Sequence, residues 1–292
     1  HRVNNTSGID ADFNNISTAI SSASAGDTLY VEGSATSYGT MSLNKELTVI
    51  GPGYFLTEND TTQAYQQSAQ FGAINFQSGS SGSVISGLHV QNGRITIQTN
   101  DIVVQRCHIY YTSTSYNLQV YSNVSNVLIT QNFIHNYYSS SSSSARCISL
   151  DGNNSNILVS NNIILRAYNI SNTSWNYAIY MPSNSSAVFQ NNTIAGGFLA
   201  YNSVVSGNVM FNGTFSGSGN TITGNVGNST QFGSSNGNRQ NVDVAGGIAG
   251  TGNYDRDAYW YAGPDTMVIT AGNPVNLTGS VYTPSSSSGT YN

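Results

Sequence analysis

VLITQNFI (127–134) is the stretch that decides the fold, because the chain repeats it as ILVSNNII (157–164) and AVFQNNTI (187–194). Each copy places an Asn between two apolar positions, one three residues before it and one two residues after it. Related copies run from residue 84 to residue 226. This regular return of the same residue types predicts a solenoid, in which each coil of the chain stacks on the one before.

The Asn column is the predicted structural ladder of this solenoid. An inward Asn at a sharp corner tolerates the left-handed conformation, and its amide can donate and accept hydrogen bonds along the stack. The alternative is a row of amides that binds a ligand, which requires the row to face outward. The predicted rungs are Asn132, Asn162, Asn192, Asn208 and Asn225, with Leu88 and Cys107 in the same column.

Three segments are predicted along the chain. Residues 1–26 form an N-terminal arm and a short amphipathic capping helix, with Asp10 or Asp12 as its N-cap. Residues 27–232 form the parallel β-helix, whose longer coils carry loops at one edge. Residues 233–292 form a C-terminal cap and a polar tail, because the columns end there and an open end would expose unpaired backbone.

The run DFNNISTAISSASAGDTLYVEGSATSYG, which starts at Asp12, and the later LNKELTVIGPGYF resemble the start of secreted pectin-lyase-like proteins. In that superfamily a helix caps the first coil, a Gly-Asp-x-aliphatic-x-aliphatic strand follows, and an aliphatic-Gly-x-Gly turn comes next. The resemblance implies an all-β, right-handed parallel β-helix of bacterial cell-surface type, and the handedness agrees with the crossover rule. The superfamily includes lyases, glycosidases, adhesins and inert solenoids, so this fold does not decide the function.

The composition is polar but poor in charge. Charged residues make up 7% of the chain, far below the level of about 25% in ordinary soluble domains. The eight Lys and Arg residues are scattered, so the sequence lacks the basic stripe that nucleic-acid binding requires. No apolar run approaches the length of about 18 residues that spans a membrane. We therefore expect an extracellular or cell-surface protein, and the start at His1 fits either a processed export or a trimmed chain.

The cysteines and histidines predict no metal site. Cys107 lies in the ladder column and should point inward, whereas Cys147 is two coils away on another face and should point outward. This geometry opposes a disulfide, so we expect two free thiols. His89 and His108 are predicted neighbours in an outward column with no third ligand. With no zinc-type spacing either, neither a metal nor a cofactor is predicted.

Catalytic candidates are few and weak. The lyases of the resembled superfamily use acidic clusters that bind Ca²⁺ with an Arg or Lys as base, and its glycosidases use Asp groups on adjacent coils. Asp151 has no second carboxylate one coil away, so this pattern is missing. The remaining candidates are Asp151, Arg146, Arg166 and His135. Ion pairing at the surface is the alternative interpretation of this group.

Aromatic residues on the long loops form a possible interaction surface, which can stack on sugar rings or bury itself against another protein. Plain loop packing is the alternative. Asp255, Asp257 and Asp265 could hold Ca²⁺, but a solvated cap loop is the favoured interpretation. The N-x-S/T sequences, such as those at Asn123 and Asn184, permit glycosylation, but chance predicts about as many. The loop aromatics are Tyr110, Tyr111, Tyr137, Tyr138, Tyr168 and Trp175.

Together these features predict a secreted, non-enzymatic structural or adhesive surface protein. It is expected to form a homo-oligomer or an extracellular fibre, through its termini or through its aromatic edge. The first alternative is a polysaccharide lyase or glycoside hydrolase, in which Asp151, an Arg and His135 converge. The second alternative is a glycan-binding module that performs no chemistry.

Overall fold

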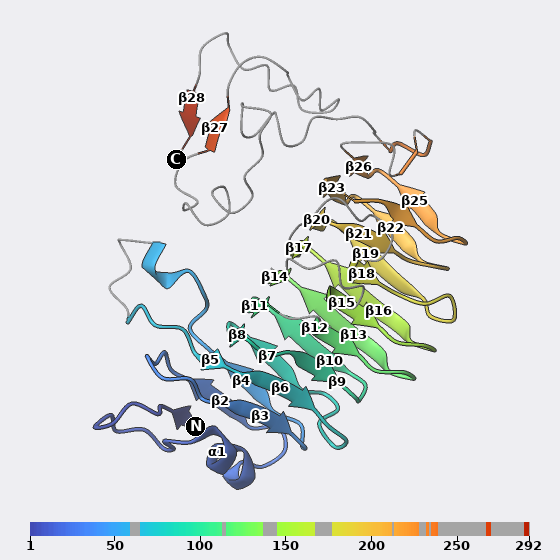
Figure 1. The fold of residues 1–292 in the computed structure, drawn as a ribbon. Helices are drawn as coiled ribbons and strands as arrows, with labels where there is room; N and C mark the ends of the chain where they lie inside the picture. Colours follow the sequence, from blue (N-terminus) through green and yellow to red (C-terminus); the bar gives the residue numbers. More distant parts are fainter. Residues whose placement is uncertain are drawn as a thin grey trace.

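The computed structural model describes residues 1–58, 65–112, 115–136, 145–166, 177–211, 213–227, 232–233, 235–238, 267–269 and 289–291. Most of its strands belong to three sheets that run along one elongated stack, and each coil adds one strand to each sheet (Figure 1). Within the described residues, neighbouring strands of these sheets pair in parallel. The chain is therefore an all-β parallel β-helix, as the repeat predicts.

Among the described residues, sheet A has ten strands, and sheets B and C have eight each. The strands of sheet A are β1 (Arg2–Val3), β2 (Thr28–Val31), β4 (Thr48–Ile50), β7 (Val84–Ser86), β10 (Ile102–Gln105), β13 (Ser125–Thr130), β16 (Ser155–Ser160), β19 (Ala187–Gln190), β22 (Val204–Ser206) and β25 (Thr221–Thr223). The strands of sheet B are β3 (Thr40–Leu43), β6 (Ala73–Phe76), β9 (Ile95–Ile97), β12 (Tyr116–Val120), β15 (Arg146–Leu150), β18 (Tyr177–Tyr180), β21 (Gly197–Leu199) and β24 (Phe215–Ser216).

Sheet C completes each coil, since the chain passes from sheet A to sheet C and then to sheet B. Its strands are β5 (Gln70–Phe71), β8 (His89–Gln91), β11 (His108–Tyr111), β14 (Phe133–Asn136), β17 (Ile163–Arg166), β20 (Thr193–Ala195), β23 (Val209–Phe211) and β26 (Val226–Gly227). Two further strands, β27 (Met267–Ile269) and β28 (Gly289–Tyr291), pair with each other in antiparallel fashion.

The core is built by alternation along each strand. In β13, Val127 and Ile129 point inward and are buried, whereas Leu128 and Thr130 point outward. The register then places like on like, so that Ile129 pairs with Val159 in the next coil. Each buried aliphatic side chain contributes roughly 25 cal/mol per Å² of apolar surface removed from water. The repeated columns therefore supply one continuous core along the stack.

The corner between sheets A and C carries the Asn ladder. Asn162 donates from Nδ2 to Asn192 Oδ1 (3.0 Å) and to the carbonyl oxygen of Ile129 (2.9 Å). Its Oδ1 accepts from the backbone N and the Nδ2 of Asn132 (2.9 and 3.0 Å). The Asn162 side chain is 1% exposed, yet its amide is fully hydrogen-bonded, as a buried polar group must be. The same bonds join Asn132, Asn162, Asn192, Asn208, Asn225 and Asn238, the last of which the sequence columns did not include.

The prediction that the rungs themselves are left-handed is wrong. Positive φ belongs to the residue before each rung, as in Gln131 (57°), Asn161 (56°) and Asn191 (55°). Each rung must align both its backbone N–H and its side-chain amide with the stack. The sharp bend therefore falls one residue earlier, where Asn and Gly adopt the left-handed conformation at low cost.

The capping helix α1 (Ile16–Ser22) starts later than predicted. Asn15 is its N-cap, and Asn15 Oδ1 accepts from the backbone N of Ser17 (2.8 Å) and Thr18 (3.2 Å). Asp12 instead accepts a hydrogen bond from the backbone N of Arg2 (2.7 Å), which ties the N-terminal arm to the stack. The predicted N-cap at Asp10 or Asp12 is therefore wrong.

Replacing Asn15 with Ala is expected to lower the free energy of unfolding by about 1 kcal/mol, because two backbone N–H groups lose their acceptor. Urea unfolding followed by circular dichroism measures this change. Asn14→Ala alters the exposed neighbour and should stay within about 0.5 kcal/mol of the wild type. Equal losses in both variants would contradict the capping role of Asn15.

The cysteines are free, as predicted, but both are buried. Cys147 was expected to point outward and is instead 0% exposed, with its Sγ donating to the carbonyl oxygen of Leu165 (3.1 Å). Asn117 occupies the same position one coil earlier and donates to the carbonyl oxygen of His135 (2.7 Å). Both side chains fill the corner between sheets C and B, where each donates to a carbonyl group of a sheet C strand.

Candidate functional site

From β2 to β25 the outer face of sheet A is a long surface built from two outward columns without a charged residue, and the second column meets Arg2 only at the terminal strand β1. We call these two columns the uncharged face. The first is mainly aliphatic and consists of Thr28, Thr48, Val84, Val103, Leu128, Leu158, Val188, Val204 and Thr221. The second is mainly hydroxyl and amide and consists of Tyr30, Ile50, Ser86, Gln105, Thr130, Ser160, Gln190, Ser206 and Thr223.

Most of the uncharged face is open to solvent, although Ser160 in its second column is buried. Val204 is 40% exposed, and Leu128 and Leu158 keep partial exposure. The hydroxyl groups of Ser160 and Thr130 lie 3.1 Å apart, so the polar column is partly linked from coil to coil. The strands that carry the face lie side by side from β2 to β25 (Figure 1). A continuous apolar column rimmed by polar groups is typical of an interaction surface.

A row of exposed amides borders the uncharged face where the sheet A strands begin. Asn156 donates from Nδ2 to Asn126 Oδ1 (2.7 Å), and Asn126 donates to Asp101 Oδ1 (2.8 Å). Hydrogen bonds from Asn126 and Ser81 lower the pKa of the Asp101 carboxyl. The surface thus has its own ladder, in which neighbouring coils hold each other's side chains in place.

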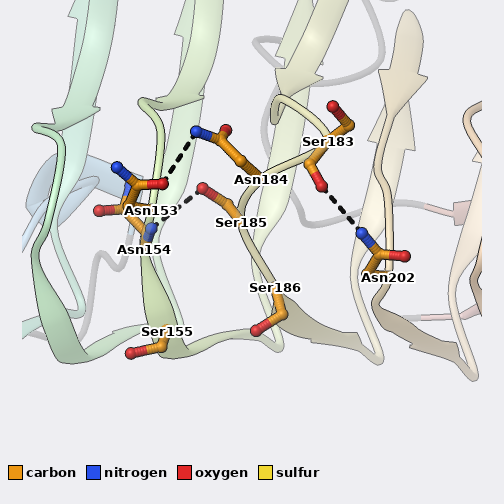
Figure 2. Close-up of a pocket in the computed structure, with 8 residues that line it drawn as sticks. All are labelled: Asn153, Asn154, Ser155, Ser183, Asn184, Ser185, Ser186 and Asn202. Atoms are coloured by element: carbon orange, nitrogen blue, oxygen red, sulfur yellow. Dashed lines mark hydrogen bonds between the residues drawn. The ribbon is translucent and has the colours of Figure 1, made fainter.

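A groove of about 430 Å³ lies at the corner between sheets B and A. Asn184 donates to Asn153 Oδ1 (3.0 Å), and Asn202 donates to the carbonyl oxygen of Ser183 (2.8 Å), as Figure 2 shows. Ser155 is the first residue of β16, so the groove adjoins the uncharged face (Figure 2). The groove is lined only by amide and hydroxyl side chains, those of Asn153, Asn154, Ser155, Ser183, Asn184, Ser185, Ser186 and Asn202.

The N-x-S sequences of this corner have a structural explanation. Asn123 and Asn153 are left-handed (φ 63° and 61°), and the residue after each is buried. Ser125 and Ser155 then begin β13 and β16. Because a bend, an inward residue and a strand start follow one another at this corner in both coils, the N-x-S spacing of Asn123 and Asn153 follows from the corner itself.

Two of the weak catalytic candidates, Asp151 and Arg146, lie on the outer face of sheet B. Asp151 Oδ2 accepts from Gln119 Nε2 (3.0 Å). Burial raises the pKa of the Asp151 carboxyl, and the Gln119 hydrogen bond and the Arg146 charge oppose that change. Arg146 donates to Ser149 Oγ (3.1 Å), and its guanidinium carbon lies 3.5 Å from the ring centre of Tyr180. The groups that act on the Asp151 carboxyl are therefore an amide and a guanidinium. The glycosidase pattern instead requires a second carboxylate beside the first.

The other two candidates lie elsewhere. His135 is on the outer face of sheet C, with its Nε2 2.7 Å from His108 Nε2. Arg166 is 3% exposed and donates from Nε to the carbonyl oxygen of Ala145, just before β15. Asp151 follows the far end of β15, which is about 20 Å of extended chain from Ala145. The structure therefore does not bring Arg166 together with Asp151.

Part of the predicted aromatic surface can be placed. Tyr110 and Tyr111 end β11, and the Tyr110 ring stacks on His135 with centres 4.6 Å apart. Outside the described residues are Tyr137, Tyr138, Tyr168, Trp175, Asp255, Asp257 and Asp265. In the part of the chain that the structure describes, no group of three or more His, Cys, Asp or Glu is arranged to hold a metal ion. No helix in that part is both long and apolar enough to cross a membrane.

No family model matches the sequence, and no curated protein matches it. Among solved structures, a chain titled "Geobacillus virus E2 - ORF18" is similar to this one, with a TM-score of 0.44 and 12% sequence identity. The match covers 77% of this chain and 55% of that chain, so this chain spans about half the length of the phage protein.

Proposed function

We propose that this protein is a non-enzymatic adhesive rod of an extracellular surface, and that it binds an uncharged, extended polysaccharide along the outer face of sheet A. The observation that carries the proposal is the uncharged face, whose two columns continue from coil to coil without a charged residue. The adjoining corner groove extends the same amide and hydroxyl chemistry. The low overall charge of the chain also supports an extracellular location.

The two columns offer a sugar chain two kinds of contact. The C–H faces of sugar rings are apolar and can pack on side chains such as Leu128 and Leu158. Sugar hydroxyls both donate and accept hydrogen bonds, as do Thr130 and Gln190. Neither contact involves a charge, so binding should depend little on salt. Because each coil repeats the contacts, weak interactions with a connected polymer add up.

The size of the uncharged face favours a polymer over a second copy of the chain. The nine strands from β2 to β25, spaced about 4.8 Å apart, span about 38 Å, and two columns are about 10 Å wide, so the face covers about 400 Å². A stable protein interface buries about 800 Å² on each partner. Two copies packed face to face would fall short of that area, whereas a polymer can continue into the groove. Assembly into a filament through the termini is the competing structural function.

Co-sedimentation with an insoluble neutral polysaccharide such as cellulose tests the proposal. Replacing both Leu128 and Leu158 with Lys is expected to weaken binding at least about 10-fold, because two cations would lose water against an uncharged ligand. The control places Lys at Thr40 and Ser42, on the outer face of sheet B, and should bind like the wild type. Binding should also be nearly equal at low and high salt.

Two results would overturn the adhesive proposal. One is equal binding by the sheet A and sheet B variants when both fold normally. The other is no wild-type binding to a panel of neutral polysaccharides. If light scattering then shows filaments at the same protein concentration, the structural function replaces adhesion.

A polysaccharide lyase or glycoside hydrolase is the second candidate, and one observation favours it. The Asp151 carboxyl has a pKa raised by burial and lies within the field of Arg146, and such a carboxyl can act as a general acid. This function predicts that the protein releases soluble sugar from the polymer it binds. Asp151→Asn would then abolish the release and keep the binding. A bound polymer that stays intact favours adhesion.

A further inference from the structure

Residues 51–57 cross the outer face of sheet C, and we call them the strap. Gly51 donates its backbone N–H to the carbonyl oxygen of Ser86 (2.8 Å), and Gly53 donates to that of Gly87 (2.9 Å). A Cβ at Gly87 would lie 2.6 Å from the carbonyl oxygen of Gly51. Gly87 therefore lets the strap approach the ladder corner closely enough to turn onto sheet C.

Two aromatic side chains fix the strap to sheet C. The ring centres of Tyr54 and Phe55 lie 5.6 and 5.2 Å from the ring centre of His108. The ring centre of Phe55 also lies 5.5 Å from that of Phe133. Phe133 belongs to a small apolar cluster with Leu165 on the same outer face, and both strap rings pack against that cluster. Phe133 is only 2% exposed although it points outward, which means that this part of sheet C is covered.

Beneath the strap lies a stack of three histidines. The register places His89 beside His108, and their rings stack with centres 4.5 Å apart. His108 Nε2 and His135 Nε2 are 2.7 Å apart, and the two rings are within 4° of parallel. Such a bond needs one nitrogen without a proton as acceptor, so both rings cannot be protonated at once. His89 Nε2 is buried and has no hydrogen-bond partner.

The strap also contains a strained residue. Phe55 has φ of 56°, a left-handed conformation that is unfavourable for a bulky side chain. Packing of the Phe55 ring on His108 and Phe133 compensates for this strain in the structure.

We propose that the strap is an acid-released latch: protonation of the histidine stack opens residues 51–57 and exposes the apolar outer face of sheet C. The proposal stands on the contacts of Tyr54 and Phe55, on the shared His108–His135 hydrogen bond and on the unpartnered nitrogen of His89. It concerns sheet C and does not depend on the proposed function of sheet A.

The direction of the pH effect follows from burial. Burial lowers the pKa of His89 from 6.5 to about 4, that of His108 to about 2 and that of His135 to about 3. The closed state therefore binds fewer protons than an open state in which the rings reach water. Below pH 6.5 the closed state loses stability as the pH falls, and above it the closed state is fully favoured.

The neighbouring titratable groups do not reverse this direction. Tyr54 faces the histidine stack from the strap. Cys107 precedes His108 in the sequence, and Tyr110 lies on β11 with its ring against that of His135. Burial raises the pKa of Tyr54 and raises that of Cys107 to about 12, so both stay neutral in mild acid. The charges that lower the pKa of His108 and His135 come from other members of the stack.

Hydrogen exchange of the full chain, measured by mass spectrometry and corrected for intrinsic rates, tests the latch. Between pH 7 and pH 5, protection of the peptide covering residues 51–57 is expected to fall at least about 20-fold, the effect of one histidine with an open-state pKa near 6.5. A peptide covering 157–164 should keep its protection. An apolar dye should gain fluorescence over the same pH range.

His108→Phe is the matched variant, because Phe133 already occupies the next position of the same column. In this variant the fall in strap protection between pH 7 and pH 5 is expected to be about 20-fold smaller than in the wild type, because one of the titrating histidines is gone. If it does not fold, His89→Phe keeps the His108–His135 bond and serves the same purpose. Unchanged protection of the wild-type strap at pH 5, or the full pH effect in a folded histidine variant, would overturn the latch.

Discussion

Replacing Asn162 with Asp is expected to lower the free energy of unfolding by about 3–5 kcal/mol at pH 7, the cost of an uncompensated buried charge. The Asn162 Nδ2 donates to Asn192 Oδ1 and to the carbonyl oxygen of Ile129. A carboxylate would point an anionic oxygen at both acceptors. The side chain is 1% exposed, so water cannot relieve the repulsion. Urea unfolding of the variant and of the wild type, both measured at pH 7 and in acid, gives this loss of unfolding free energy.

Asn156→Asp is the control for this prediction, because it makes the same change in the exposed amide row. Asn156 donates to Asn126 Oδ1 (2.7 Å) but is open to water, so its loss should stay below about 1 kcal/mol. The Asn162→Asp penalty should shrink in acid, since a protonated carboxyl is neutral and donates one hydrogen bond. Equal unfolding midpoints for the two variants would contradict a buried, saturated ladder.

The Asn column could be predicted because each rung is framed by aliphatic positions at a constant offset. Asn238 could not, since the residues around it are Ser235, Asn236 and Gly237 and no aliphatic frame remains. The position of the bend was ambiguous in the coils where Asn also precedes the rung, as at residues 161 and 162, although Gly207 and Gly224 mark it in the later coils. Asn suits a left-handed corner and an amide rung equally well, so composition cannot decide which of the two does which.

The candidate site was less accessible to sequence reasoning. Leu128 and Thr130 alternate with buried residues in the repeat, so the uncharged face was present in the pattern. The superfamily's catalytic pattern consists of acidic pairs, so a surface without acids carries no signal of that kind. The strap left no periodic signal at all, because it joins residue 55 to residues 108 and 133 of later coils. Contacts between an irregular segment and a distant column depend on the folded path of the chain.

Gly93→Ala is expected to lower the free energy of unfolding by at least about 3 kcal/mol, the upper end for overpacked sites. A Cβ at Gly93 would overlap the carbonyl group of Gly72 in the preceding coil. That group belongs to the backbone, so no side-chain rotation can make room. Ile74, which lies two residues after Gly72, donates its backbone N–H to the carbonyl oxygen of Arg94, the residue after Gly93 (3.0 Å). Moving the coils apart would therefore also weaken a hydrogen bond between them.

Gly72→Ala provides the matched comparison, because the coil before Gly72 is farther away. A Cβ there would meet Gly39 O at 3.7 Å, an ordinary contact. We expect this variant to unfold within about 1 kcal/mol of the wild type, since Ala also restricts the unfolded chain. Thermal and urea unfolding of both variants give the difference, and similar stabilities would contradict the close approach at Gly93. A large difference would show that the spacing between coils is limited by backbone contact at this corner as well as by the ladder.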